Sequence, residues 1–278
     1  MISAYGGHVR KAMNSGGDVP VFEVNPEVKR AYPNGDVLPG VWITRPVEDG
    51  GGKAQGRTYV TLYNPHDDTP DGEDALWFGS GYYEEAMGYT DAADRGKRID
   101  CFRAAELLYR HAAGMGNHVA DLCLGYVYSY DRCAGAYWES APNANSAEGA
   151  SALSRQARAY ECFAAAAQAG IPEACYKFGD MLKRGEGCEP DAQAVFRWYA
   201  RASELVKHEN PVILGSIALR LGECYEEGLG CAQDFSRALQ WYEQAEKALS
   251  VAVEAGESWY EKALSGARSG VKRCKQEV

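Results

Sequence analysis

The sequence predicts an all-α solenoid of stacked helical hairpins, preceded by a small irregular or β-containing N-terminal extension. Three observations support this prediction: a glycine marker recurs in four helical segments, a second helical pattern follows each marker, and the intervals between them reduce to one repeat length. A hairpin of this kind buries its apolar faces against its neighbours, so a stack of hairpins forms a continuous core. We expect about four helix-turn-helix units wound into a right-handed superhelix.

The first helix of each unit is marked by a glycine that follows an apolar residue and precedes another apolar or aromatic residue by three positions. The flanking apolar residues fall on one face of a helix, and the glycine allows a neighbouring helix to approach closely. The four marker glycines are Gly79, Gly125, Gly179 and Gly222.

The second helix of each unit has small residues seven positions apart with aromatic residues between them. Small residues on both sides of an aromatic stripe give a helix that can pack against two neighbours, as a stacked hairpin requires. The pattern occurs at Ala105–Ala112, Ala159–Ala166, Val195–Ala202 and Ala238–Ala245.

The spacing of these motifs defines the repeat. The shortest distance from a marker glycine to the second pattern is 16 residues, and the shortest from that pattern to the next marker is 20 residues, which gives a unit of 36 residues. The intervals between successive marker glycines exceed this unit by 10, 18 and 7 residues, and the extra residues all lie in the connections between helices. Constant helices joined by variable loops are typical of solenoid repeats.

The last two units carry a further motif in the loop between their helices. The loops read R-G-E-G-C-x-x-D over residues 184–191 and E-G-L-G-C-x-x-D over residues 227–234. A glycine can adopt positive φ and end the first helix, and an aspartate can cap the start of the second. We therefore assign structural roles to Gly185, Gly187, Asp191, Gly228, Gly230 and Asp234.

Together with L-G-x-x-Y at 221–225 and A-x-x-W-Y-x-x-A at 238–245, these loops resemble the Sel1-like repeat, a relative of the tetratricopeptide repeat with a longer loop inside each hairpin. The resemblance covers about residues 73–250 and is most specific in the last two units. It implies an α-solenoid that serves as a non-catalytic scaffold or adaptor for another protein.

The first two units depart from the family pattern, because inserts at residues 87–96 and 131–150 replace the Gly-x-Gly loop. The second insert contains Tyr137 and Trp138, two aromatic residues that are unusual on a solvated loop. Either they pack back onto the solenoid or they contact a partner.

The predicted domains are an extension over residues 1–72, the solenoid over 73–266 and a tail over 267–278. In the extension, 41–43 and 58–63 are the best strand candidates, since the second is β-branched and aromatic. A hairpin of these two strands must pack on another element to be stable. After Ala245 the chain continues with helical spacing, which suits a terminal capping helix before a frayed tail.

Composition indicates which classes of partner and which cellular compartment to expect. The net charge of −10 argues against nucleic acid or an anionic membrane surface as partner. It suits a basic protein or peptide, although such a charge also aids solubility. The nine cysteines include no C-x-x-C pair, and the sequence has no apolar run of membrane-spanning length. The first residues lack an apolar segment, so we do not expect them to be a secretory leader. We expect a cytoplasmic protein with reduced thiols.

Catalytic motifs are lacking in the sequence: it contains no nucleophile elbow, phosphate loop or H-E-x-x-H motif. We therefore expect neither enzymatic activity nor a cofactor or metal. His111 and His118 are expected at a helix end or on the surface. The run His66-Asp67-Asp68 could ligate a metal, but a turn between two prolines explains it more simply.

Two alternatives stay open. The extension could carry an enzymatic or small-ligand activity in a polar pocket lined by Tyr59, His66 and Asp67, with the solenoid as its support. The chain could also be a bacterial effector or immunity component, which the sequence does not separate from an adaptor.

The resemblance also places a binding site. In tetratricopeptide-like solenoids the first helix of each hairpin lines the concave face, and aromatic and acidic residues there would favour a basic partner. The alternative is that these positions form an ordinary solvated helix face. The candidate partner-binding residues are Tyr83, Glu84, Tyr126, Tyr130, Glu173, Tyr176, Asp180, Arg184, Glu223 and Glu227.

Overall fold

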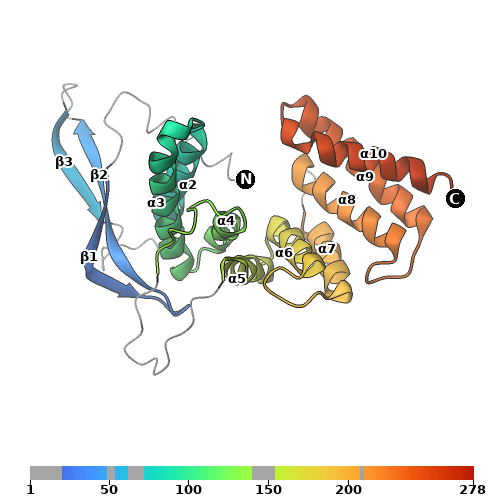
Figure 1. Ribbon diagram of the computed structural model, residues 1–278, viewed down its shortest axis with the longest axis horizontal. Coiled ribbons are helices and arrows are strands. Elements are labelled where there is room, and N and C mark those ends of the chain that lie inside the picture. Colours follow the sequence, from blue (N-terminus) through green and yellow to red (C-terminus); the bar gives the residue numbers. More distant parts are fainter. Residues whose placement is uncertain (1–20, 49–53, 62–71, 140–153, 207–209) are drawn as a thin grey trace. The chain divides into compact units, whose positions relative to one another are not determined.

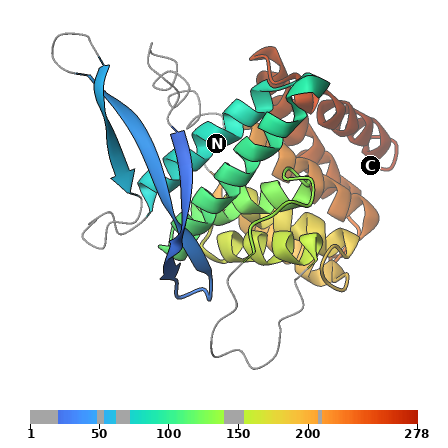
Figure 2. The same cartoon turned by 60° about the vertical axis from the view of Figure 1, so that its left-hand side comes forward.

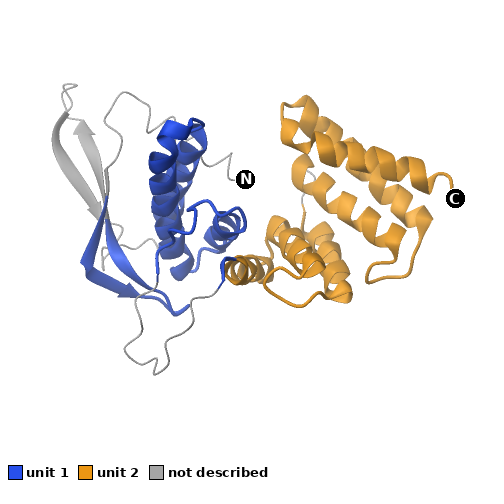
Figure 3. Ribbon diagram, viewed as in Figure 1, with its two compact units in different colours: residues 1–155 blue, residues 156–278 orange. Residues whose placement is uncertain are grey.

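A computed structural model describes residues 21–48, 54–61, 72–139, 154–206 and 210–278. The chain divides into two compact units, unit 1 over residues 1–155 and unit 2 over residues 156–278 (Figure 3). The predicted boundary at residue 72 separates the extension from the first helices, but both lie in unit 1.

The described residues are mainly helical, which confirms an all-α solenoid of hairpins with a small β-containing extension (Figure 1). Two single 3-10 turns, η1 (Ala92–Asp94) and η2 (Ser258–Tyr260), precede α3 and α10. The helices are α2 (Glu73–Gly88), α3 (Arg95–Gly114), α4 (His118–Ser129), α5 (Arg155–Gln168), α6 (Pro172–Arg184), α7 (Ala192–Leu205), α8 (Pro211–Glu227), α9 (Phe235–Glu254) and α10 (Glu261–Cys274).

The extension forms a three-stranded antiparallel sheet in the order β1 (Val21–Ala31), β2 (Val37–Glu48), β3 (Ala54–Thr61). The predicted pairing of 41–43 with 58–63 is confirmed for the residues that the structure describes, since Ile43 lies opposite Val60. β1 was not predicted. The β1–β2 turn contains Gly35 at φ 90°, and Tyr32 donates its backbone N–H to the carbonyl of Asp36 at 2.8 Å.

The sheet packs on α3, the second helix of the first hairpin (Figure 2). Arg110 of α3 forms a two-pronged ion pair with Asp36 at the β1–β2 turn, with N···O distances of 2.5 and 3.1 Å. Leu38 and Val41 of β2 are fully buried, and Gly114 of α3 lies directly against the Tyr32 ring. The hairpin therefore has the support that a small sheet needs.

His111 of α3 is buried in this contact, so the expectation of a surface histidine is wrong although the helix-end position is right. Its Nε2 lies 3.0 Å from the carbonyl oxygen of Pro39, which can only accept a hydrogen bond. Nε2 therefore carries the proton, and Nδ1 accepts from the Tyr32 hydroxyl at 2.6 Å. Both contacts use a neutral imidazole.

The free energy of unfolding should fall as the pH is lowered, because His111 is buried in its neutral form. Burial lowers its pKa from 6.5 to about 4. Below pH 6.5 the unfolded chain takes up a proton that the folded chain refuses, so stability on the order of 3 kcal/mol is lost between pH 6.5 and 4. Urea unfolding across this range should show the loss in the native chain and a flatter profile in His111→Gln. Equal slopes in both would contradict the assignment.

The second insert packs back onto α3. The Trp138 indole donates from Nε1 to the carbonyl of Arg103 at 2.9 Å, and the Trp138 backbone N–H donates to Glu106 at 3.0 Å. Glu106 is fully buried and also accepts from the Tyr128 hydroxyl at 2.9 Å. Of the two readings for this insert, the structure selects packing for Trp138; residues 140–153 lie outside the described residues.

In unit 2 the loop residues of the last two hairpins take the predicted roles. Gly185 and Gly228 end α6 and α8 with φ of 68° and 70°. Asp191 and Asp234 cap α7 and α9 by accepting the N–H of the third residue of each helix, both at 2.9 Å. These contacts fix the reversal of the chain inside each hairpin.

Three of the four marker glycines, Gly79, Gly179 and Gly222, lie against an aromatic ring of the second helix. An added Cβ at Gly79, Gly179 or Gly222 would lie less than 3 Å from the ring of Tyr109, Tyr199 or Tyr242, respectively. Each ring is fully buried. The close helix approach inferred from the marker is thus made by a tyrosine of the paired helix.

The second glycine of each loop joins successive repeats. An added Cβ at Gly187 would lie 2.7 Å from the carbonyl oxygen of Gln156 in α5, and one at Gly230 would lie 2.0 Å from that of Ala192 in α7. Both glycines have positive φ, 79° and 70°. Each therefore permits both the turn and the contact with the preceding repeat.

The C-terminal end differs from the prediction. The helix after Ala245 does not run on; it ends at Glu254, and Gly256 at φ 100° reverses the chain into α10. Val271 and Cys274 are buried, so residues 267–274 are part of the last helix and not of a separate tail, and the fraying expected for residues 272–278 is wrong for 272–274. Within the described part of the chain, no helix is long and apolar enough to cross a membrane.

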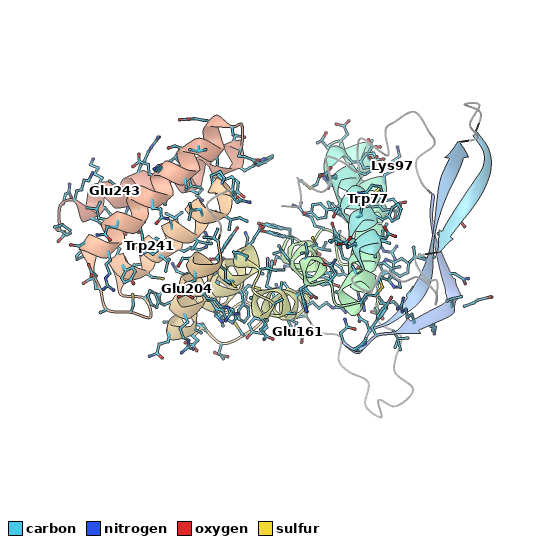
Figure 4. The ribbon with its side chains drawn as sticks, turned by 180° about the vertical axis from the view of Figure 1, so that it is seen from behind. Trp77, Lys97, Glu161, Glu204, Trp241 and Glu243 are labelled. Atoms are coloured by element: carbon cyan, nitrogen blue, oxygen red, sulfur yellow. The ribbon has the colours of Figure 1, made fainter. Side chains whose placement is uncertain are left out.

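α10 closes unit 2 through packing and ion pairs. The Tyr242 ring lies between Gly222 of α8 and Gly270 of α10. Lys275 pairs with Glu243 of α9, which is labelled in Figure 4, with an N···O distance of 3.3 Å. Arg273 pairs with Glu226 of α8 at 2.6 Å. This is the capping role that the sequence predicts.

Candidate functional site

The predicted partner-binding residues fall on the first helices of the hairpins and belong to both units. Tyr83 and Glu84 lie on α2, with Tyr126 on α4 and Tyr130 at its C-terminal end, all in unit 1. The other six lie on α6 and α8 of unit 2. The surfaces of the two units are described separately.

In unit 1 an arginine brings three tyrosines of the predicted site together. Arg132 donates from Nε to the Tyr83 hydroxyl at 3.2 Å, and its guanidinium lies 5.0 Å from the centre of the Tyr130 ring. The rings of Tyr126 and Tyr130 are parallel, with centroids 6.0 Å apart. Tyr83 is buried, Tyr126 is half-buried and Tyr130 is 56% exposed. We call Tyr126, Tyr130 and Arg132 the aromatic surface.

In unit 2 the predicted residues Tyr176 and Asp180 belong to a buried network. Asp180 accepts from Arg220 of α8 at 2.5 and 2.6 Å and from the Tyr199 hydroxyl at 2.7 Å. Burial favours the neutral acid, but Arg220 and Tyr199 outweigh it and lower the pKa of Asp180. The Arg220 guanidinium lies 4.6 Å from the centre of the Tyr176 ring, and Tyr176 is only 2% exposed. This network joins α6 to α8.

The remaining predicted charges of unit 2 have partners within the chain. Lys183 of α6 lies 3.2 Å from Glu223 and 3.9 Å from Glu227, both of α8. Arg184 lies 2.8 Å from Glu186 in the following loop. The positive charge of Lys183 offsets part of the attraction that Glu223 and Glu227 would exert on a basic ligand, so these carboxylates give weaker support for such a ligand than the sequence suggested.

Sequence reasoning missed the arginines that organise both surfaces. Arg132 lies in the second insert and Arg220 two residues before a marker glycine, positions for which the repeat pattern carries no signal. Asp180, the partner of Arg220, is 8% exposed in the structure, although the resemblance placed it on the partner-binding face. A buried carboxylate needs a cationic partner, so the unpredicted burial of Asp180 also concealed its pairing with Arg220.

Among the described residues, no three or more histidine, cysteine, aspartate or glutamate side chains converge as metal ligands. The buried polar groups Glu106, Arg110 and His111 are engaged in holding the sheet and the second insert on α3. The alternative pocket of Tyr59, His66 and Asp67 lies outside the residues whose side chains are described.

Comparison with known proteins identifies two repeats in unit 2. Residues 172–206 and 218–248 match the Sel1 repeat family model. The chain is similar to a Sel1 repeat protein from Oxalobacter formigenes, with 25% identity, a TM-score of 0.38, and coverage of 58% of this chain and 95% of the other. No curated protein matches it significantly.

A second solved structure is a protective antigen, c5321, of uropathogenic Escherichia coli that displays an SLR fold. The identity is 18%, the TM-score is 0.31, and the match covers 74% of this chain but only 57% of the antigen. The two segments that match the family model overlap the hairpins α6–α7 and α8–α9.

Both segments also contain the loop glycines, the capping aspartates and the glycine–tyrosine contacts described above. Sel1 repeats typically mediate contacts between proteins and are generally not catalytic. The two matched segments of the second unit are thus Sel1-like repeats.

Proposed function

We propose that this chain is a non-catalytic scaffold or adaptor that binds a protein or peptide through the first-helix face of its solenoid. The observation that carries the proposal is the aromatic surface. Tyr130 is one of the few large apolar side chains left exposed among the described residues, and its ring is held by stacking on Tyr126 and by Arg132. Rigid aromatic rings supply contact area with little loss of conformational entropy on binding.

The position of the aromatic surface supports the same proposal. Tyr126 lies on α4 and Tyr130 at its C-terminal end, which is the helix that the family resemblance expects on the concave face, and both tyrosines were predicted as binding residues on that ground. The unit 2 residues support it less directly, because Tyr176 and Asp180 serve the buried network with Arg220. Replacing those two would disturb folding as well as binding.

The double variant Tyr126→Ala/Tyr130→Ala tests this proposal. Affinity purification from the native source with quantitative mass spectrometry should retain at least one protein on the native chain, and lose about tenfold or more of it on the variant, as expected for an aromatic hot spot. Leu205→Ala, which removes an exposed apolar side chain at the end of α7, is the control. Circular dichroism should show both variants folded.

Two results would count against the proposal. A partner retained equally by the native chain and the double variant would place the binding site elsewhere. The absence of any protein retained above a blank support would contradict protein binding itself.

A further inference from the structure

The corner between α9 and α10 presents a tryptophan to solvent. Trp259 is 85% exposed, more than any other large apolar side chain of the described residues. The corner is ordered, because the N–H of Glu257 bonds to the carbonyl of Ala252 and that of Tyr260 to the carbonyl of Glu257, at 3.0 and 3.1 Å. Tyr260 packs on the core of unit 2. Trp259 is therefore held outward by a fixed turn.

The exposure of Trp259 sets it apart from the tryptophans of the repeat pattern. Trp198 contacts the Phe178 ring edge-on, and Trp241 packs on the core formed by α8, α9 and α10. An exposed indole in an ordered corner gains little packing energy in the free chain, and tryptophan is among the residue types that contribute most to binding energy at protein interfaces.

The charges of the corner are mostly negative. Residues 254–262 include the exposed carboxylates Glu254, Glu257 and Glu261 and a single cation, Lys262, which gives a formal charge of −2. In the part of the chain that the structure describes, none of the three carboxylates takes part in an ion pair. Glu254 is the last residue of α9, where the negative end of the helix dipole disfavours a carboxylate.

We propose that the α9–α10 corner docks a basic segment of a protein partner, with a lysine or arginine side chain on the Trp259 indole and the three carboxylates around it. A cation over an indole face is the most favourable cation–π pair, and neighbouring carboxylates add attraction of the same sign. This proposal rests on the protein-binding role proposed above and goes beyond it, because it adds a second contact that lies away from the first-helix face. The acidic surface expected to attract a basic ligand is then the α9–α10 corner and not the α6–α8 face, because Lys183 pairs with Glu223 and Glu227 on that face.

Panning a library of random twelve-residue peptides on the full chain tests the proposal. Peptides enriched in lysine and arginine should be recovered, and their affinity, measured by fluorescence anisotropy, should weaken about tenfold in Trp259→Ala and fall with added salt. The triple variant Glu254→Gln/Glu257→Gln/Glu261→Gln should weaken binding similarly. The control Glu243→Gln/Glu246→Gln, which removes two α9 carboxylates that already pair with α10, should leave it unchanged.

Other outcomes would overturn the proposal. Recovery of no peptides, or of peptides without basic residues, would contradict a basic ligand. Basic peptides that lose affinity in Tyr126→Ala/Tyr130→Ala but not in Trp259→Ala would move the site to the aromatic surface and leave the proposed function intact. Self-association in sedimentation that disappears in Trp259→Ala would assign the corner to a second copy of this chain.

Discussion

Replacing Gly230 with alanine should destabilise unit 2 by about 3–5 kcal/mol. The new methyl group would meet the carbonyl oxygen of Ala192 at 2.0 Å, and the backbone oxygen of a capped helix cannot move aside easily. The residue would also have to keep a φ of 70°. Urea unfolding, with hydrogen–deuterium exchange read on α7 and α8, would measure the loss.

Gly228→Ala is the matched control for that experiment. Gly228 has the same φ of 70°, but its added Cβ would come no closer than 3.5 Å to any atom. Only the backbone strain remains, so we expect a loss of about 1–2 kcal/mol. Equal losses in the two variants would show that the close contact between repeats contributes nothing, and would contradict the role given to the second loop glycine.

Replacing Arg110 with methionine should destabilise unit 1 by about 3–5 kcal/mol, because it leaves a buried carboxylate without its cation. The Arg110 side chain is 6% exposed, and it lies between Asp36 at the β1–β2 turn and the fully buried Glu106. It also donates to the carbonyl of Trp138 at 2.6 Å. The amides of β1, β2 and Trp138 should therefore lose protection from exchange together.

Lys97→Met serves as the control for the arginine variant. Lys97 pairs with Asp94 at 3.0 Å, but its side chain is 68% exposed. An exposed pair contributes little, so the loss should stay below about 0.5 kcal/mol. If Arg110→Met costs no more than Lys97→Met, the sheet is not held on α3 by this network.

The parts of the fold that the sequence predicted are those encoded within one repeat. Helix caps, loop glycines and the marker glycine depend on neighbours a few residues away, so Gly185, Asp191 and Gly222 could be assigned from spacing alone. The missed sheet contact joins residues about 75 positions apart, Asp36 and Arg110, and no local pattern links them. β1 itself had a signal, since Asn34-Gly35 is a strong hairpin turn.

The candidate site was predicted less completely because side-chain partners depend on tertiary structure. The repeat pattern placed Tyr126 and Tyr130 on one helix face, where they stack. It gave no indication that Lys183 would pair with Glu223 or that Arg220 would pair with Asp180, since these pairs join successive repeats 40 residues apart. Both pairs remove charge from the face that had been expected to attract a basic ligand.

Photo-crosslinking in the native cell tests the central claim most directly. With p-benzoylphenylalanine in place of Tyr130, we predict a discrete adduct with another protein. The same group in place of Arg197, an exposed residue on the second helix of a hairpin, should give little or none. No protein adduct at position 130, or equal adducts at both positions, would contradict the claim that this chain binds a protein through the first-helix face.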